Sequence, residues 1–268
     1  MKLYVANVGV NKSDADKRGI KSPIFYDGTF EFIPIKGSKA DSKYTHHKYD
    51  NLPCFNNPKF SLAHYVGPKY ADYAVHNDPE FVTFTYGDIN TARGSNLRNI
   101  QKDDVLLFLA RLFDYSEGAG FSQTSRFYFV GYLTIDYALE FTGGVRNTKL
   151  SVPDDVKGNA HYVGYSHGKK GPFRVLKGIP KTSFRFKKAL KVTPEVAALV
   201  FNGKYNPKHD SFISNKDGHP VLNKNGKITR FGLFHSKTRT VQAYLDSNEP
   251  TEKSSLLGLL NLIERECL

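Results

Sequence analysis

Two adjacent apolar runs within residues 102–135 constrain the fold more than any other part of the chain. The first begins at Val105 (Val-Leu-Leu-Phe-Leu-Ala-Arg-Leu-Phe) and the second at Arg126 (Arg-Phe-Tyr-Phe-Val-Gly-Tyr-Leu-Thr-Ile). Their β-branched and aromatic residues, bounded by Asp, Gly and Ser, predict two buried strands. The Ser- and Gly-rich segment 115–125 predicts a loop too long for a tight hairpin. Gly131 predicts a bulge, a bend or the close approach of another backbone.

Shorter segments predict the elements around these two strands. In chain order they are a strand at 2–10, a loop at 11–21, two short strands around an Asp-Gly turn at 22–35, an edge strand at 159–165, a helix that begins at a Thr-Pro cap at 193–194, and an amphipathic helix at 251–266. Strands and helices in this mixed order predict an α+β fold. We expect a single domain spanning residues 1–268.

The composition excludes several classes of protein. The chain has 268 residues, of which 40% are hydrophobic, so it is long enough to bury a substantial core and is not expected to be disordered. Two cysteines are too few for a disulfide framework, which favours a reducing compartment. No apolar run reaches the length of a membrane span, and the first residues do not form a signal peptide. A soluble, cytoplasmic protein is therefore expected.

Positive charge is concentrated in one segment. The formal net charge is +12, which attracts polyanions, and residues 157–193 contain no Asp or Glu. Aromatic residues are interleaved with the cations there, as in grooves that hold phosphates and stack bases. The alternative is that these rings pack the core while the cations face solvent. The segment predicts nucleic acid as the partner, with Lys169, Lys170, Arg174, Lys177, Arg185, Lys187 and Lys188 as binding residues. DNA is expected ahead of RNA, although the segment itself does not decide between them.

Four polar residues are candidates for catalysis. His76 and Asp78 share a turn, and a carboxylate beside a histidine can set its tautomer and pKa so that the ring works as a general base. The structural alternative is that Asp before Pro forms the turn. Asp27, beside Gly28, has the same two interpretations. For His161, in the predicted edge strand, the alternative to acid–base catalysis is a histidine of the core or its rim whose hydrogen bonds are satisfied.

Motifs for cofactors and metals are missing from the sequence. There is no Gly-rich phosphate loop, no dinucleotide-binding fingerprint and no His-Glu-x-x-His, so no cofactor is expected. The adjacent His46 and His47 point in different directions and have no third ligand at a suitable spacing, so no metal site is expected either. One pattern keeps the possibility of a metal-dependent nuclease open. It is the Asp-x-Lys triplet Asp155-Val156-Lys157, with Asp136 upstream as a possible second metal ligand.

Several short motifs occur together in the first half of the chain. They are Ser-Pro-Ile-Phe-Tyr-Asp-Gly at 22–28, His-Asn-Asp-Pro at 76–79 and Leu-Arg-Asn at 97–99, ahead of the two central runs. In this combination the chain, over about residues 1–245, resembles the third type of nucleotide modification associated domain. It departs from that pattern at residues 110–113, where Ala-Arg-Leu-Phe replaces an expected Trp-containing segment. A stacking role at that position is therefore open.

This resemblance implies a role in prokaryotic or phage systems that install or process modified bases, including defence. It also implies functional roles for Ser22, Asp27, His76, Asp78, Arg93, Asn96 and His161, with Arg93 and Asn96 on the nucleic-acid side. The Asp-Asp turn, strand, loop and Gly-containing strand also resemble PUA-like domains (the EVE, YTH and ASCH relatives). Those domains are bent, barrel-like sheets that bind nucleic acid at a modified or flipped base.

Three functions remain open at this point. The first is a nucleic-acid-binding protein of the base-modification machinery that recognises or processes a base. The second is an enzyme, either a metal-dependent nuclease or a base-modifying enzyme, using Asp27, His76 and Asp78. The third is a non-catalytic subunit whose cations bind an acidic partner. The sequence does not decide between catalysis and binding, and it does not fix the oligomeric state.

Overall fold

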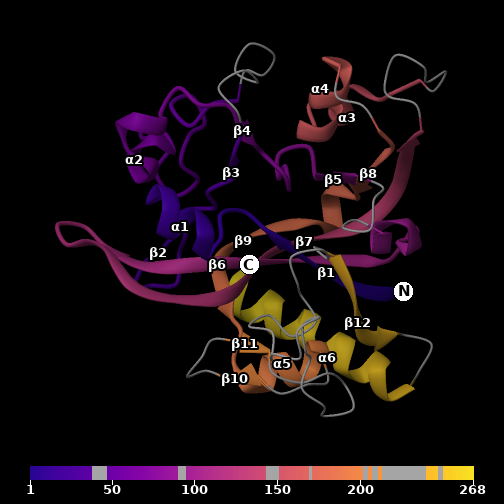
Figure 1. Ribbon diagram of the computed structural model, residues 1–268. Coiled ribbons are helices and arrows are strands. Elements are labelled where there is room, and N and C mark those ends of the chain that lie inside the picture. Colours follow the sequence, from indigo (N-terminus) through magenta and orange to yellow (C-terminus); the bar gives the residue numbers. More distant parts are fainter. Residues whose placement is uncertain are drawn as a thin grey trace, which may run out of the picture.

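The computed structural model describes residues 1–37, 47–89, 95–142, 151–168, 171–201, 205–206, 211–212, 240–246 and 250–268. A large sheet crosses the middle of the molecule (Figure 1), with helices α5 (Pro194–Phe201) and α6 (Pro250–Cys267) on one side. Helices α2 (Ala63–Val66), α3 (Asp154–Lys157) and α4 (Ala160–Ser166) lie on the other side. This arrangement confirms the predicted α+β class.

The sheet has the strand order β12-β1-β6-β7-β8-β5, with β2 paired to β6 and β9 paired to β7. Strand β1 runs parallel to β6, whereas β7 is antiparallel to β6, β8 and β9. The described strands do not close into a barrel, so the barrel-like part of the prediction is not confirmed. The strands are β1 (Lys2–Val8), β2 (Pro23–Ile24), β5 (Thr85–Ile89), β6 (Val105–Ser116), β7 (Gly120–Phe141), β8 (Phe173–Gly178), β9 (Phe184–Lys191) and β12 (Thr240–Asp246).

The two apolar runs form the centre of this sheet, as predicted. The first nine residues of β6 are all buried, and their neighbours on β7 complete the main hydrophobic core. Both strands continue past the runs, so the predicted loop at 115–125 is wrong: Tyr115 pairs with Phe121 across a short turn. Polar residues in that stretch are exposed along the hairpin rather than in a loop.

Gly131 lies where a second strand approaches closely, as predicted. The register between β6 and β7 shifts beside it, and so does the register between β7 and β9. A Cβ added at this position would lie 2.5 Å from the carbonyl oxygen of Phe184 and 2.6 Å from the ring of Phe81. Only glycine leaves room for the β9 backbone here.

Helix α1 (Lys12–Arg18) occupies the segment that was predicted to be a loop, and that prediction is wrong. The side chain of Asn11 accepts a hydrogen bond from the backbone at the helix start, and Asp14 accepts one in return from the Asn11 N–H. This reciprocal cap satisfies donors that a short helix otherwise leaves unpaired. Gly19, at a φ of 71°, ends the helix.

The C-terminal helix agrees with its predicted range to within one residue at each end. Leu256, Leu259 and Ile263 of α6 are buried in the main core, and α6 contacts β9, β12 and α5. No helix among the described residues is long and apolar enough to cross a membrane. The remaining elements are β3 (Ile35–Lys36), η2 (Pro68–Tyr70), β4 (Val75–His76), η3 (Ser95–Asn99), η5 (Pro180–Thr182), β10 (Tyr205–Asn206) and β11 (Ser211–Phe212).

Candidate functional site

Two of the predicted nucleic-acid-binding cations on β8 have internal partners. Arg174 donates hydrogen bonds to the backbone carbonyls of Leu97 and Ile100, at 2.8 and 3.0 Å. The side chain of Lys177 is 9% exposed, and its ammonium lies 2.8 Å from a carboxylate oxygen of Asp155. Arg174 therefore ties the η3 segment (Ser95–Asn99) to the sheet and Lys177 ties helix α3 to it, and neither presents its charge on an open surface.

Arg185 of β9 is also an internal residue. Its guanidinium donates to the carbonyl of Phe30 at 2.9 Å, lies 3.5 Å from the buried carboxylate of Glu31 and covers the ring of Phe55 at 3.7 Å. Burial lowers the pKa of Arg185 to about 10, which still leaves it charged at neutral pH. It ties the β9 strand to the segment that follows β2.

Exposed positive charge on β9 lies at Lys187, Lys188 and Lys191. These side chains face solvent on the strand that pairs with β7, so phosphate contact at Lys187 and Lys188 stays a prediction that their exposure permits. Lys169, Lys170 and Arg93 lie outside the described residues, and the Asn96 side chain is outside them too.

Asp27 forms a turn beside this strand. One oxygen of its carboxylate accepts hydrogen bonds from the hydroxyl and the backbone N–H of Thr29, at 2.7 and 2.9 Å. These two hydrogen bonds lower the pKa of Asp27 below its ordinary value, and the bond from the Thr29 hydroxyl has the larger effect. Thr29 forms a β-bridge with Lys188, and the adjacent Tyr26 is fully exposed. The structure places Asp27 in a surface turn with an aromatic ring and a cation as neighbours.

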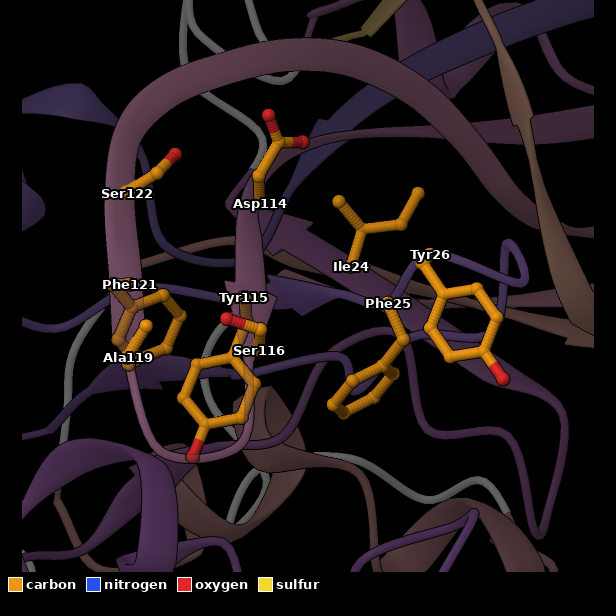
Figure 2. A pocket seen from close by; sticks show the side chains of 10 residues that line it. Ile24, Phe25, Tyr26, Asp114, Tyr115, Ser116, Ala119, Phe121 and Ser122 are labelled. Carbon is orange, nitrogen blue, oxygen red and sulfur yellow. The ribbon is translucent and has the colours of Figure 1, made fainter.

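An aromatic pocket of about 340 Å³ opens next to that turn (Figure 2). It is lined by β2, Tyr26 and the far ends of β6 and β7, including Tyr115, Phe121 and the carboxylate of Asp114. The Tyr115 and Phe121 rings meet edge to face, with centroids 4.9 Å apart. Lys21 places its ammonium 5.6 Å from the centre of the Phe121 ring. The pocket thus combines ring faces with one acidic hydrogen-bond acceptor.

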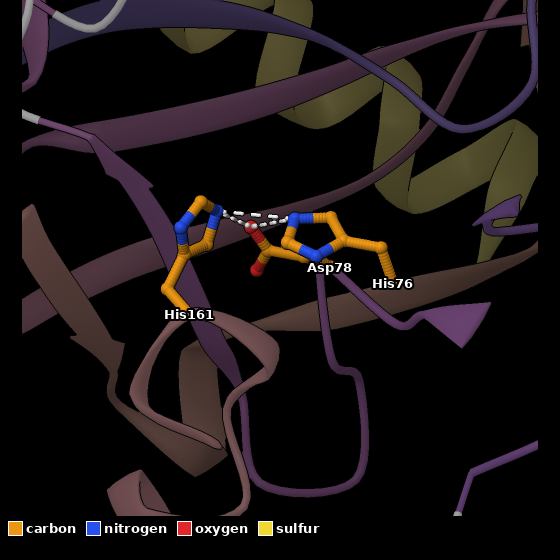
Figure 3. A group of neighbouring side chains, drawn as sticks. All are labelled: His76, Asp78 and His161. Atoms are coloured by element: carbon orange, nitrogen blue, oxygen red, sulfur yellow. Dashed lines mark hydrogen bonds and ion pairs between the residues drawn. The ribbon is translucent and has the colours of Figure 1, made fainter. Parts of the chain in front are cut away.

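His76, Asp78 and His161 come together at a different place, between β4 and α4 (Figure 3). The Nε2 atoms of the two histidines lie 3.1 Å apart. Oδ2 of Asp78 lies 3.5 Å from Nε2 of His161 and 4.0 Å from Nε2 of His76. The side chains are 29% (His76), 2% (Asp78) and 12% (His161) exposed, so the cluster is accessible from the His76 side. Asp27 does not belong to this cluster, and β2 and α4 lie on opposite sides of Figure 1.

The carboxylate of Asp78 is fixed by donors from two other segments. The backbone N–H of Gly87 in β5 donates to both oxygens, at 3.0 and 3.1 Å, and the side-chain amide of Asn159 donates to Oδ1 at 3.2 Å. These donors suit an ionised carboxylate, and Oδ2 of that carboxylate faces two imidazole nitrogens. Gly87 also provides space, since a Cβ there would lie 2.9 Å from Asn159 Oδ1 and from Cδ2 of His161.

Helix α4 positions His161, so the predicted edge strand at 159–165 is wrong. Asn159 caps the helix, accepting a hydrogen bond from the backbone N–H of His161 at 3.0 Å. One turn later, Tyr165 stacks on Phe173 of β8 with centroids 4.1 Å apart, and Phe173 stacks on Phe141 of β7 at 4.3 Å. These stacked rings anchor the helix to the sheet, and Asn159 links the histidine to the aspartate.

Two kinds of chemistry suit this geometry. Two imidazoles 3.1 Å apart can share one proton between their nitrogens, with the carboxylate stabilising the positive charge. Alternatively, the three ligand atoms, which all lie within 4.8 Å of one another, can surround a metal ion. The two acidic residues that left a metal-dependent nuclease open in the sequence have cation partners: Asp155 pairs with Lys177, and Asp136 lies 3.7 Å from Lys102.

Sequence reasoning named all three members of the cluster but missed the residues that support them. Asn159 gives little signal in the sequence because it contacts Asp78 from 81 residues away. Gly87 lies nine residues from Asp78, but its contribution is a backbone N–H, which no side-chain pattern reveals. The one available sign was Asn159 ahead of an apolar stretch, which is an N-cap pattern. Ser22, which the resemblance singled out, is buried, and its hydroxyl accepts a hydrogen bond from the backbone N–H of Ile33 at 3.1 Å.

A family model described as nucleotide modification associated domain 3 matches residues 2–193. The matched segment contains the histidine and aspartate cluster, the aromatic pocket and the exposed lysines of β9, and it ends before α5. No curated protein and no solved structure matches the chain.

Proposed function

Because the chain belongs to the nucleotide modification associated domain 3 family, we propose that it works in nucleotide modification by binding nucleic acid and recognising or processing a base. Membership confirms the resemblance found in the sequence. The observation that carries the proposal is the meeting of His76, Asp78 and His161 within the matched segment. Buried carboxylates that face histidines are typical of sites that move protons or bind metals. Burying a carboxylate also costs folding free energy, so such a group is more common where it serves a function.

The nucleic-acid part of the proposal is supported by the surface beside the Asp27 turn. The fully exposed Tyr26 lies next to the Asp27–Thr29 turn that pairs with Lys188, and the aromatic pocket opens at the same turn. A stacking ring, a cation and a pocket with an acceptor form a combination that suits a nucleotide chain, with lysines on phosphates and rings on bases. We propose DNA as the partner, ahead of RNA.

A base that is processed must leave its stack to reach a side chain in a protein. PUA-like domains, which the strand pattern resembles, often bind nucleic acid at a modified or flipped base, and a PUA-like mode of binding stays a prediction here. In this proposal the β9 lysines hold the backbone, and the cluster of His76, Asp78 and His161 acts on the base or recognises it.

The experiment measures binding of the purified protein to labelled duplex and single-stranded DNA, and to RNA of the same sequence, over a range of salt concentrations. The logarithm of the binding constant should fall steeply with the logarithm of salt concentration. In the Lys187→Ala/Lys188→Ala double variant that slope should decrease by roughly 1.8 for duplex DNA, since each neutralised phosphate contributes roughly 0.9. Lys253→Ala is the matched control, because Lys253 is an exposed lysine on α6 outside the matched segment.

The same assay tests the alternative of a non-catalytic subunit that binds an acidic protein. A partner-binding subunit would show weak DNA binding with equal slopes for the wild type, the double variant and Lys253→Ala. That result would refute the nucleic-acid proposal.

A further inference from the structure

We propose that His76, Asp78 and His161 bind one divalent first-row transition-metal ion, with the two histidine Nε2 atoms and Oδ2 of Asp78 as ligands. The inference deepens the proposed function, since it concerns the same cluster, but metal binding is measured without nucleic acid. It gives that site a specific chemistry, namely an ion with coordination positions left for water or for an atom of the substrate.

The distances between the ligand atoms agree with this assignment. Metal–nitrogen bonds of about 2.05 Å with angles between 90° and 109° place two ligand atoms roughly 2.9–3.4 Å apart. The two Nε2 atoms, at 3.1 Å, lie inside that range, and Oδ2 lies 3.5 Å from Nε2 of His161, just above it. The remaining separation, 4.0 Å between Asp78 and His76, exceeds the range by roughly half an ångström. His76 is the most exposed of the three side chains, so a small rotation of its ring can close that gap.

The hydrogen bonds of Asp78 orient its carboxylate as a metal ligand. The Asn159 amide donates to Oδ1, the Gly87 N–H is shared between both oxygens, and Oδ2 is the oxygen that faces the imidazoles. Outer donors of this kind fix the orientation of a ligand carboxylate, which raises metal affinity. Asn159 also accepts a hydrogen bond from the backbone N–H of His161, so one side chain aligns two of the ligands.

The ligand types indicate which metal. Two imidazoles with one carboxylate favour ions of the series from Mn²⁺ to Zn²⁺, whereas Mg²⁺ and Ca²⁺ prefer sites made of oxygen ligands alone. Three protein ligands leave at least one position open, which distinguishes reactive sites from structural zinc sites with four. His76 is the most exposed of the three ligands, so the open coordination position faces solvent on the His76 side of the cluster.

The competing explanation is a proton shared by the two histidines next to the charged Asp78. Such a pair also brings the Nε2 atoms to about 3 Å. A shared proton needs only the two imidazoles to be close, whereas a metal site needs all three ligand atoms to converge from different directions. Figure 3 shows His76 and His161 approaching from opposite sides, with the Asp78 carboxylate beside their facing nitrogens. The two rings lie at 82° to each other. Three ligand atoms thus converge from different directions, which favours a common ion.

The experiment titrates the purified, metal-free protein with Co²⁺, followed by its visible absorption, and with Zn²⁺, Mn²⁺ and Mg²⁺ by calorimetry. One equivalent of Co²⁺ should bind and give an intense visible band. Asp78→Asn and His161→Gln should abolish the band, and Asn159→Ala should weaken Zn²⁺ binding by about 10- to 100-fold. His76→Ala, at the rim, provides a variant whose folding is least at risk. His64→Ala is the matched control, because His64 is an exposed histidine outside the cluster.

No binding of Co²⁺ or Zn²⁺, or binding that is equal in the wild type and in His76→Ala, would overturn the proposal. Binding of Mg²⁺ as tight as that of Zn²⁺ would overturn the assignment of the metal class. The two proposals fail separately. A protein that binds Zn²⁺ at the cluster but shows no affinity for nucleic acid refutes the proposed function and leaves the metal site intact.

Discussion

Substituting Gly87 by alanine tests how tightly the cluster is built. The added Cβ would lie 2.9 Å from Asn159 Oδ1, 2.9 Å from Cδ2 of His161 and 3.2 Å from its Cβ. The φ of Gly87 is not in the left-handed region, so alanine strains no backbone angle and keeps the N–H that donates to Asp78. The variant therefore introduces a steric conflict and nothing else. Overpacking of this kind costs about 1–3 kcal/mol in the free energy of unfolding.

The assay is urea unfolding, together with thermal unfolding and Zn²⁺ calorimetry on the same samples. A loss of about 1–3 kcal/mol corresponds to a midpoint lower by roughly 2–12 °C for a chain of this size. Displacing Asn159 or His161 should also weaken Zn²⁺ binding by about 10- to 100-fold. Gly158→Ala is the control, because a Cβ there meets no atom within 4 Å and its φ is −76°. Equal stability and equal metal affinity in the two variants would refute the packing described for the site.

Three further predictions concern the fold. Gly131→Ala should lower the free energy of unfolding by about 3 kcal/mol in urea titrations, because its Cβ would lie 2.5 Å from a backbone carbonyl oxygen. A smaller loss than that of Gly158→Ala would contradict this prediction. Arg185→Ala should cost about 3–5 kcal/mol in the same titration, since it leaves the buried Glu31 carboxylate without its cation, and a cost under 1 kcal/mol would show that the pair is dispensable. Burial raises the pKa of Cys54 from 9.0 to about 12. The folded state therefore holds this proton more tightly, so its contribution to stability is complete below pH 9 and is lost as the pH rises toward 12. Stability should fall over that range, less steeply in Cys54→Ala, and identical slopes would contradict the assignment.

The central strands could be predicted from sequence because their signal is strong and local. β6 and the middle of β7 consist of long apolar runs, and few other structures accommodate such runs in a chain of this size. The short helices α1 and α4 were missed because each has only seven residues and little apolar periodicity. Their caps, Asn11 and Asn159, were the available signals, and they carry more information than the composition of the segments.

In the charged segment 157–193, the number of cations does not indicate which of them are exposed. Exposed and internal cations alternate along it: Lys187 and Lys188 face solvent, whereas Arg174 and Arg185 have internal partners. Net charge is a property of the sequence, but the direction of each side chain depends on strand register and on partners from distant segments. Those partners lie too far along the chain for local patterns to identify.

The sequence identified the three residues of the candidate site, but it did not predict that they lie together. His76 and Asp78 are two residues apart, so their pairing follows from the local turn. His161 joins them from 85 residues away, through a helix that the sequence did not predict, and Gly87 and Asn159 complete the site from β5 and the helix cap. Convergence of this kind depends on tertiary packing.

The most direct test of a common metal site is ¹⁵N NMR of the imidazole nitrogens during a Zn²⁺ titration. Of the nine histidines in the chain, two should respond, His76 and His161, each through Nε2 and both saturating together at one equivalent. In Asp78→Asn both responses should weaken together. Independent responses of the two rings, or a response at His64 with His76 and His161 unchanged, would contradict the shared site.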